Sequence, residues 1–210
     1  MKQSKIFYAI VSGFFKIFLK IYNRCSSKWL EKLPDDEKMI VACNHTSNMD
    51  PVIVGCFFPR RLRYLAKEEL FTFWPFAVCI KALGAIPVSR TSNSSAAGAL
   101  RAFMKLYEEG NDVLIFPEGG RSTDGKLQPL EAGVALIAAR EHAPILPVFI
   151  KGSFDAMPPG AAFIKPKKVK ITFGKPLRFS DEVYKSKEGR NIIMDSLNKA
   201  MKELELESEA

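Results

Sequence analysis

The stretch Met39-Ile40-Val41-Ala42-Cys43-Asn44-His45-Thr46-Ser47-Asn48-Met49-Asp50 joins an apolar run to a polar turn. Pro51 and a second apolar run, residues 52–58, follow it directly. A short apolar run of this kind predicts a buried strand, and a polar turn followed by Pro predicts the start of a helix. The sequence therefore predicts that His45 lies at the end of a strand and Asp50 near the amino end of the next helix.

This predicted placement of His45 and Asp50 suits general-base chemistry. An imidazole accepts a proton near neutral pH. A carboxylate that binds its other ring nitrogen fixes the tautomer and stabilises the imidazolium. The alternative is that His45 is a structural histidine and that Asp50 only caps the helix.

A second stretch, Phe116-Pro117-Glu118-Gly119-Gly120-Arg121-Ser122, again places a polar, Gly-rich turn after an apolar run, residues 113–115. Adjacent glycines let a backbone turn sharply and approach a ligand closely, and exposed N–H groups in such a turn favour an anion. The guanidinium of Arg121 fits phosphate oxygens with two hydrogen bonds. The alternative is a simple loop with a surface ion pair between Glu118 and Arg121.

Taken together, the two stretches resemble the glycerolipid acyltransferases, in particular the 1-acylglycerol-3-phosphate acyltransferases. That family carries an N-H-x-x-x-x-D block, here residues 44–50, and an F-P-E-G-x-R-S block, here residues 116–122. Two weaker blocks match in order, at residues 84–90 and 145–148. The resemblance covers roughly residues 38–175, and four ordered blocks are more specific than any single motif.

The resemblance implies a 1-acylglycerol-3-phosphate O-acyltransferase. Such an enzyme moves a fatty acyl group from acyl-CoA or acyl-carrier protein to the free sn-2 hydroxyl of lysophosphatidic acid, giving phosphatidic acid in phospholipid biosynthesis. A thioester is already activated, so the reaction needs a base, correct placement and charge stabilisation, but no acyl-enzyme. The sequence contains no G-x-S-x-G block, which agrees with this mechanism. We expect no cofactor and no metal site, with the thioester as a co-substrate.

By the same resemblance, His45 would remove the hydroxyl proton while Asp50 holds its ring. Glu118 and Arg121 would belong to the acceptor site, where Arg121 would bind the glycerol phosphate and Arg90 would assist it.

Three further residues of the acceptor site follow from the resemblance. Gly119 and Gly120 would shape the turn, although the family commonly has Thr at the position of Gly120, so that a hydroxyl contact is absent here. Lys67 would bind the same phosphate. The alternative for Lys67 is a solvated lysine at the start of a helix.

Three rival functions remain open at this point. The acceptor could be glycerol 3-phosphate, another lysophospholipid or a lyso-aminolipid, although Arg90 and Arg121 favour a phosphate. The protein could instead be an acyl thioesterase, in which His45 and Asp50 activate water. It could also be a lipid-binding module without catalytic activity.

The basic charge of the protein is unevenly distributed. The net charge is +8, yet residues 181–210 hold eight acidic and five basic residues, so the excess lies in residues 1–180. A basic body suggests an anionic partner such as phosphates, a membrane surface or nucleic acid. No recognisable nucleic-acid-binding module is present, so we expect no nucleic acid partner.

The N-terminal segment predicts an amphipathic helix. In residues 4–24, Lys and other polar residues recur at three- and four-residue steps beside an aromatic and aliphatic face. The longest uncharged run, residues 6–15, is too short to span a bilayer, which takes roughly 20 apolar residues. This pattern favours a helix lying in a membrane interface, with the protein peripheral or monotopic at the cytoplasmic face of a membrane. The alternative is a helix packed on the domain core.

Alternating short apolar runs and helical patterns predict an α/β fold: a single domain with a mixed, mostly parallel sheet flanked by helices. We expect residues 1–30 to form the N-terminal amphipathic, membrane-interface helix and residues 31–210 the acyltransferase domain. The patterns predict helices over residues 96–109, 129–143 and 181–206, an edge or half-buried strand over residues 168–173, and an irregular excursion over residues 157–167. His142 is expected at the end of a helix.

Overall fold

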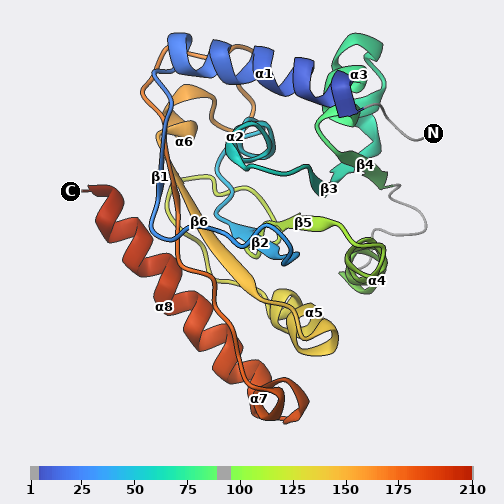
Figure 1. Ribbon diagram of the computed structural model, residues 1–210. Helices are drawn as coiled ribbons and strands as arrows, with labels where there is room; N and C mark the ends of the chain where they lie inside the picture. The colour runs from blue at the N-terminus through green and yellow to red at the C-terminus, as the bar shows by residue number, and fades with distance from the viewer. Residues whose placement is uncertain (1–4, 89–95, 210) are drawn as a thin grey trace.

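The computed structural model describes residues 5–88 and 96–209 (Figure 1). The predicted site residue Arg90 lies outside the described residues. The elements in chain order are α1 (Lys5–Tyr22), β1 (Ser26–Trp29), β2 (Ile40–Cys43), α2 (Asp50–Phe57), β3 (Leu62–Lys67), the 3-10 helix η1 (Glu68–Phe71), α3 (Trp74–Ala82), β4 (Ala85–Val88), α4 (Ala96–Glu108), β5 (Asp112–Ile115), α5 (Gly133–Glu141), β6 (Ile145–Lys151), α6 (Ser153–Ala156), β7 (Lys170–Phe173), α7 (Asp181–Lys185) and α8 (Gly189–Glu209).

One sheet of seven strands forms the centre of the described chain, in the order β1-β7-β6-β2-β5-β3-β4. Neighbouring strands are parallel except for β6 and β7, which are antiparallel. This confirms the predicted α/β fold with a mixed, mostly parallel sheet.

Helices cover both faces of the sheet, and the alternation of side chains along β2 shows how (Figure 1). Val41 and Cys43 belong to the core that contains residues of α1, α2 and α3. Ile40 and Ala42 belong to a second core, formed with residues of α4, α5 and α8. Because both faces of β2 are buried, the strand needs the continuous apolar run that the sequence shows.

The carboxyl ends of the parallel strands meet at one edge of the sheet, where ligands of open α/β sheets commonly bind. The pairing of β2 with β5 places the turn after Cys43 next to the turn after Ile115. Lys67, the last residue of β3, ends at the same edge because β3 also pairs with β5 in parallel. The two stretches that the sequence singled out are therefore neighbours in space.

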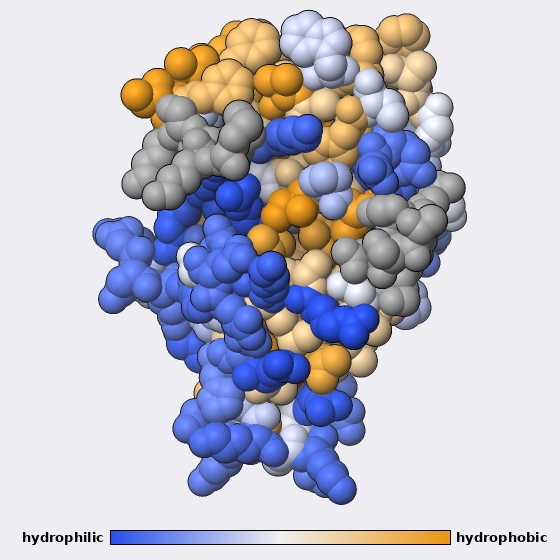
Figure 2. Space-filling model, turned by 90° about the vertical axis from the view of Figure 1, so that its right-hand side faces the viewer, coloured by the Kyte–Doolittle hydropathy of each residue, from blue (hydrophilic) through white to orange (hydrophobic). Residues whose placement is uncertain are grey.

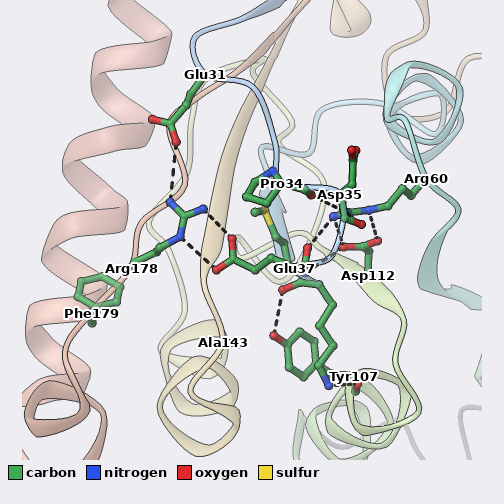
Figure 3. A network of polar contacts seen from close by, with 12 residues as sticks. Glu31, Pro34, Asp35, Glu37, Arg60, Tyr107, Asp112, Ala143, Arg178 and Phe179 are labelled. Atoms are coloured by element: carbon green, nitrogen blue, oxygen red, sulfur yellow. Dashed lines mark hydrogen bonds and ion pairs between the residues drawn. The ribbon is translucent and has the colours of Figure 1, made fainter.

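A polar network ties the link before β2 to the opposite edge of the sheet (Figure 3). The Arg60 guanidinium donates to both oxygens of Asp112, at 2.9 Å each. It also donates to the backbone carbonyls of Pro34, Asp35 and Glu37. Arg178 pairs with Glu37 at 2.6 Å. Asp112 is the first residue of β5, so this network fixes the amino ends of the strands while the carboxyl ends remain available for a site.

Two predicted helices differ from the structure. The helix expected over residues 129–143 begins only at Gly133, because the amides of Gln128 and Glu131 donate to Glu118 and to the Pro117 carbonyl instead of forming helical bonds. It ends at His142, which has a left-handed backbone (φ 47°) as its C-cap.

The helix expected over residues 181–206 is two helices, α7 and α8. The Ser186 side chain accepts the Gly189 amide at 2.8 Å, so a side chain caps the new helix at the break.

The N-terminal segment contributes a strand that the sequence did not predict. β1, within residues 1–30, pairs in parallel with β7. As a result β7 lies inside the sheet, between β1 and β6, and not at its edge.

Candidate active site

His45 lies two residues after Cys43, the last residue of β2, and its ring is held by Asp50. The Nδ1 atom of His45 lies 2.9 Å from Asp50 Oδ2. The same oxygen accepts the backbone N–H groups of Thr46 and Ser47, each at 2.7 Å. The spacing of five residues works because Asp50 begins α2 and its side chain reaches back over the turn.

The fully buried Asp50 side chain determines which nitrogen of His45 can act as a base. A carboxylate that accepts two backbone N–H groups is an acceptor, so Nδ1 of His45 carries the proton in their mutual hydrogen bond. In the neutral imidazole this leaves Nε2 unprotonated and able to take a proton. The first residue of a helix also suits a negative charge, because the helix dipole is positive at that end.

The aromatic ring of Phe116 fixes the plane of the His45 imidazole. The two rings stack with centroids 4.0 Å apart and an interplanar angle of 20°. The side chain of His45 remains 18% exposed, and it lines the cavity described below. A ring held by a carboxylate at one nitrogen and by an aromatic face therefore presents its other nitrogen to a cavity.

The turn after β5 is joined to His45 through backbone groups. The His45 N–H donates to Glu118 Oε1 at 2.6 Å, and the His45 carbonyl accepts the Ser122 N–H at 2.7 Å. The second oxygen of Glu118 accepts the Gln128 N–H at 2.9 Å. Burial raises the pKa of Glu118 above its ordinary value, while these two backbone hydrogen bonds act in the opposite direction.

Glu118 thus connects the turn after β2 with the turn after β5 through its hydrogen bonds. It forms no ion pair with Arg121. It does not line the cavity, whereas Gly119, Gly120 and Arg121 do. Its assignment to the acceptor site remains a prediction, and the structure adds a positioning role that the sequence did not suggest.

The two glycines of the turn after β5 have different surroundings. Gly119 has φ 68°, and a side chain there would clash with the carboxylate of Glu131. A Cβ at Gly120 would meet no atom within 4 Å, so this position borders open space. Gly119 is therefore required by the backbone, and Gly120 leaves room at the cavity.

Two cationic side chains reach the cavity. Arg121 is half-buried and, among the residues that the structure describes, forms no hydrogen bond or ion pair. Lys67 is exposed and lines the same cavity from the end of β3. His45, Lys67 and Arg121, far apart in sequence, therefore share one cavity, and their roles there remain predictions.

The cavity has a volume of about 1230 Å³, and its wall is mostly apolar. Pro51 and Val52 of α2, the helix that begins at Asp50, line the wall. The mostly apolar residues 71–76 contribute no described lining residue. Sequence reasoning missed four lining residues, Phe15 and Phe18 of α1 and Leu100 and Phe103 of α4.

Glu131 is a further lining residue that the sequence did not single out. Its backbone N–H donates to the Pro117 carbonyl at 2.7 Å, so it belongs to the second turn and not to the following helix. No sequence signal distinguished it, because it lies in an apparently helical pattern.

Neighbouring polar residues hold the turn after β2, which carries His45, in place. The Asn44 side chain both donates to and accepts from the backbone of Ile150, at 3.0 and 2.7 Å, and so extends the pairing of β2 with β6. Thr46 bonds to Ser153 at 2.8 Å, and the Ser47 hydroxyl donates to the Met157 carbonyl at 2.7 Å. The turn that carries His45 is therefore fixed to three parts of the chain.

This arrangement defines an α/β enzyme site in which a carboxylate-oriented histidine faces a large, mostly apolar cavity with cationic groups. The model of the family described as acyltransferase matches residues 25–151. A 1-acyl-sn-glycerol-3-phosphate acyltransferase of Bacillus subtilis (strain 168) is 32% identical over 189 residues, which cover 89% of this chain and 88% of that protein.

A second relative and a solved structure are also similar to this chain. A protein of the same name from Streptococcus pneumoniae (strain R6) is 26% identical over 211 residues, covering 99% of this chain and 76% of that protein. The crystal structure of the 1-acyl-sn-glycerophosphate acyltransferase of Thermotoga maritima matches with a TM-score of 0.74 and 25% identity, covering 94% of this chain and 79% of that one. The chain belongs to the acyltransferase family, and the protein is an acyltransferase enzyme.

Proposed function

We propose that the protein transfers a fatty acyl group from a thioester, acyl-CoA or acyl-carrier protein, to the free sn-2 hydroxyl of lysophosphatidic acid and so makes phosphatidic acid for phospholipid biosynthesis. The observation that carries the proposal is that His45, oriented through Nδ1 by Asp50, lines the same cavity as Arg121. The proteins named above, with which this chain shares most of its length, are named for acyl transfer to this acceptor.

In the proposed reaction, the acceptor oxygen attacks the thioester carbonyl while Nε2 of His45 takes the hydroxyl proton. Asp50 stabilises the imidazolium that forms. The tetrahedral intermediate then expels the thiolate, which receives the proton from His45, so the base is regenerated. General-base assistance of this kind is worth about a hundred- to ten-thousandfold in rate.

Arg121 suits the phosphate of the acceptor because its guanidinium is free of partners among the described residues and lies beside a Gly turn. Lys67, which lines the same cavity, adds a second positive charge. The apolar wall, formed in part by Phe15 and Phe103, suits an acyl chain.

We further propose that α1 holds the protein peripherally or monotopically at the cytoplasmic face of a membrane. None of the described helices is both long and apolar enough to cross a bilayer. On α1, however, five apolar side chains at three- and four-residue steps are between 61% and 75% exposed, namely Ile6, Ile10, Phe14, Ile17 and Ile21.

Leu19 on the other side of α1, and Asn23 directly after the helix, are buried in the domain. α1 therefore packs on the core with one face and leaves an apolar stripe uncovered, which fits an interfacial helix. Figure 2 shows apolar residues gathered at the top of the molecule, where α1 and α3 lie, above a mostly hydrophilic lower half.

The experiment that tests the proposed reaction combines the purified protein with lysophosphatidate and either acyl-CoA or acyl-carrier protein, and identifies the products by mass. Phosphatidate is expected, and His45→Ala is expected to lower kcat by at least about a hundredfold. His142→Ala is the matched control, because His142 is the second of the two histidines and caps α5 away from the cavity. Release of free fatty acid without acceptor would instead indicate a thioesterase, and no product with either donor would indicate a lipid-binding module.

A further inference from the structure

The segment between α6 and β7, residues 157–168, is irregular but firmly attached to two functional parts of the molecule. At its start, the Met157 carbonyl accepts the hydroxyl of Ser47, in the turn that carries His45, at 2.7 Å. At its end, Asn23 donates to the carbonyls of Lys165 and Lys167 at 2.9 and 3.1 Å. Figure 1 shows this segment, coloured orange, beside the carboxyl end of α1.

The neighbouring residues of α1 add to this attachment. The Tyr22 hydroxyl donates to the Ile164 carbonyl at 3.0 Å, and the Arg24 guanidinium donates to the Pro166 carbonyl at 3.3 Å. Ile164 in turn lines the cavity. The segment is therefore a fixed connection between the exposed helix α1 and the wall of the active-site cavity.

The outer side of this segment combines one bare aromatic side chain with three lysines. Phe163 is 84% exposed, the highest value for any large apolar residue in the part of the chain that the structure describes. Lys165, Lys167 and Lys168 are exposed and form no ion pair with any described residue. Neither Phe163 nor these lysines line the cavity. Neither packing in the core nor a place in the active-site cavity therefore explains why these four side chains are present.

The two stretches of chain that meet at the segment carry charges of a single sign. Residues 1–30 and residues 156–180, which the hydrogen bonds from α1 bring together, contain no Asp or Glu. Lys20 and Arg24, near the carboxyl end of α1, are exposed and add to the three lysines of the segment. The acid nearest to the segment in the sequence is Asp155. Such a surface is complementary to an anionic one.

We propose that residues 161–168 form a second membrane contact, which recognises an anionic lipid surface: Phe163 inserts into the interface, and Lys165, Lys167 and Lys168 bind lipid phosphates. The proposal rests on the proposed function only in taking the acceptor to be a membrane lipid. An exposed aromatic residue followed closely by lysines is typical of an interfacial membrane contact. The exposed apolar stripe of α1 continues to Ile21, next to Tyr22, so a lipid surface explains both features, whereas an acidic protein partner explains only the charge.

The test measures the binding of the full-length protein to vesicles of phosphatidylcholine alone and of phosphatidylcholine with phosphatidylglycerol. Replacing Lys165, Lys167 and Lys168 together by Gln should weaken binding to the anionic vesicles by about a hundredfold and leave binding to neutral vesicles unchanged. Phe163→Ser should weaken binding to both kinds of vesicle by about tenfold. The matched control replaces Lys187, Lys199 and Lys202 by Gln, since these exposed lysines on or before α8 give the same change in net charge.

Equal effects of the two triple variants, or no effect of the first, would overturn the proposal. A first triple variant that binds vesicles normally but has a raised KM for the acyl donor would assign the surface to the donor and also overturn it. With lysophosphatidate dispersed in detergent, the first triple variant should keep its kcat. Failure of the proposed function is distinguishable, because it would appear as no acyl transfer by the unmodified protein, whatever the vesicle binding.

Discussion

The backbone N–H of His45 lies 2.6 Å from Glu118 Oε1, so the residue proposed as the base is bonded directly to the second sequence block. The other oxygen of Glu118 accepts the Gln128 N–H. The carboxylate is therefore occupied on both sides by backbone donors, and its role is to hold the two turns at a fixed distance.

We expect Glu118→Ala to lower kcat strongly while changing the KM for the acceptor little. The substitution leaves two half-buried N–H groups unpaired, at a cost of about 1–3 kcal/mol in the free energy of unfolding. The displaced His45 turn would then misplace the base. Steady-state kinetics and thermal unfolding of the variant check both parts. A large rise in acceptor KM with kcat retained would show instead that Glu118 contacts the substrate.

Asp50→Asn should abolish most of the activity without unfolding the protein. An Asn oxygen in the place of Oδ2 can still accept the N–H groups of Thr46 and Ser47 and the Nδ1 proton of His45, while the amide NH₂ takes the place of Oδ1. The orientation of the ring is then kept, but the negative charge that stabilises the imidazolium is lost. We expect kcat to fall by at least about a hundredfold with the unfolding transition nearly preserved. An unchanged kcat would mean that the charge of Asp50 does not contribute to the reaction.

Arg121→Gln should raise the KM for lysophosphatidate and leave the KM for the thioester donor unchanged. A charged, two-bonded contact with phosphate is lost, so an increase of about tenfold to a hundredfold is expected. Lys67→Gln tests the second cation in the same assay and should give a smaller increase, because Lys67 is more exposed. Arg190→Gln on α8, exposed and remote from the cavity lining, is the matched control. Equal KM values for Arg121→Gln and the control would remove Arg121 from the acceptor site.

Burial should keep the thiols of Cys25 and Cys56 unreactive in the folded protein. Burial raises the pKa of each to about 12. An ordinary cysteine, with a pKa near 8.5, becomes mostly thiolate between about pH 7 and about pH 9, and its alkylation accelerates accordingly. Because a raised pKa keeps the protonated form, alkylation of these two residues should stay slow over the same interval. Mass mapping after iodoacetamide treatment, with unfolded protein as the control, checks this; rapid modification in the folded state would contradict the burial.

The local part of the site could be predicted from sequence because its residues are close in the chain. His45 and Asp50 belong to one strand–turn–helix unit, whose apolar run and Pro signal are strong. The parallel strand ends then bring the second turn and Lys67 to the same edge, which follows from the fold class.

The rest of the site depends on long-range contacts between groups that have no sequence signature. The bond from the His45 backbone to Glu118 joins residues 73 positions apart and uses a main-chain donor that every residue except Pro carries. α5 begins later than the sequence predicted for the same reason, because the backbone N–H groups of Gln128 and Glu131 form hydrogen bonds with the turn after β5. Phe15 and Phe103 line the cavity because of how α1 and α4 pack. Their apolar periodicity is that of any helix packed on a core, so it does not predict that they line a cavity.

Replacing Ile10, Phe14 and Ile17 of α1 together by Ser should release the protein from vesicles while the fold is kept. These side chains are 61% to 67% exposed, so their loss removes little packing within the domain. Each apolar group withdrawn from the interface should weaken vesicle binding by about tenfold. Deletion of α1 would be a poorer test, because Leu19 is 2% exposed and belongs to the core. Leu19→Ser is the contrasting variant: it should lower the unfolding temperature, whereas the triple variant should not. If the triple variant still sedimented fully with vesicles, α1 would not be the membrane anchor.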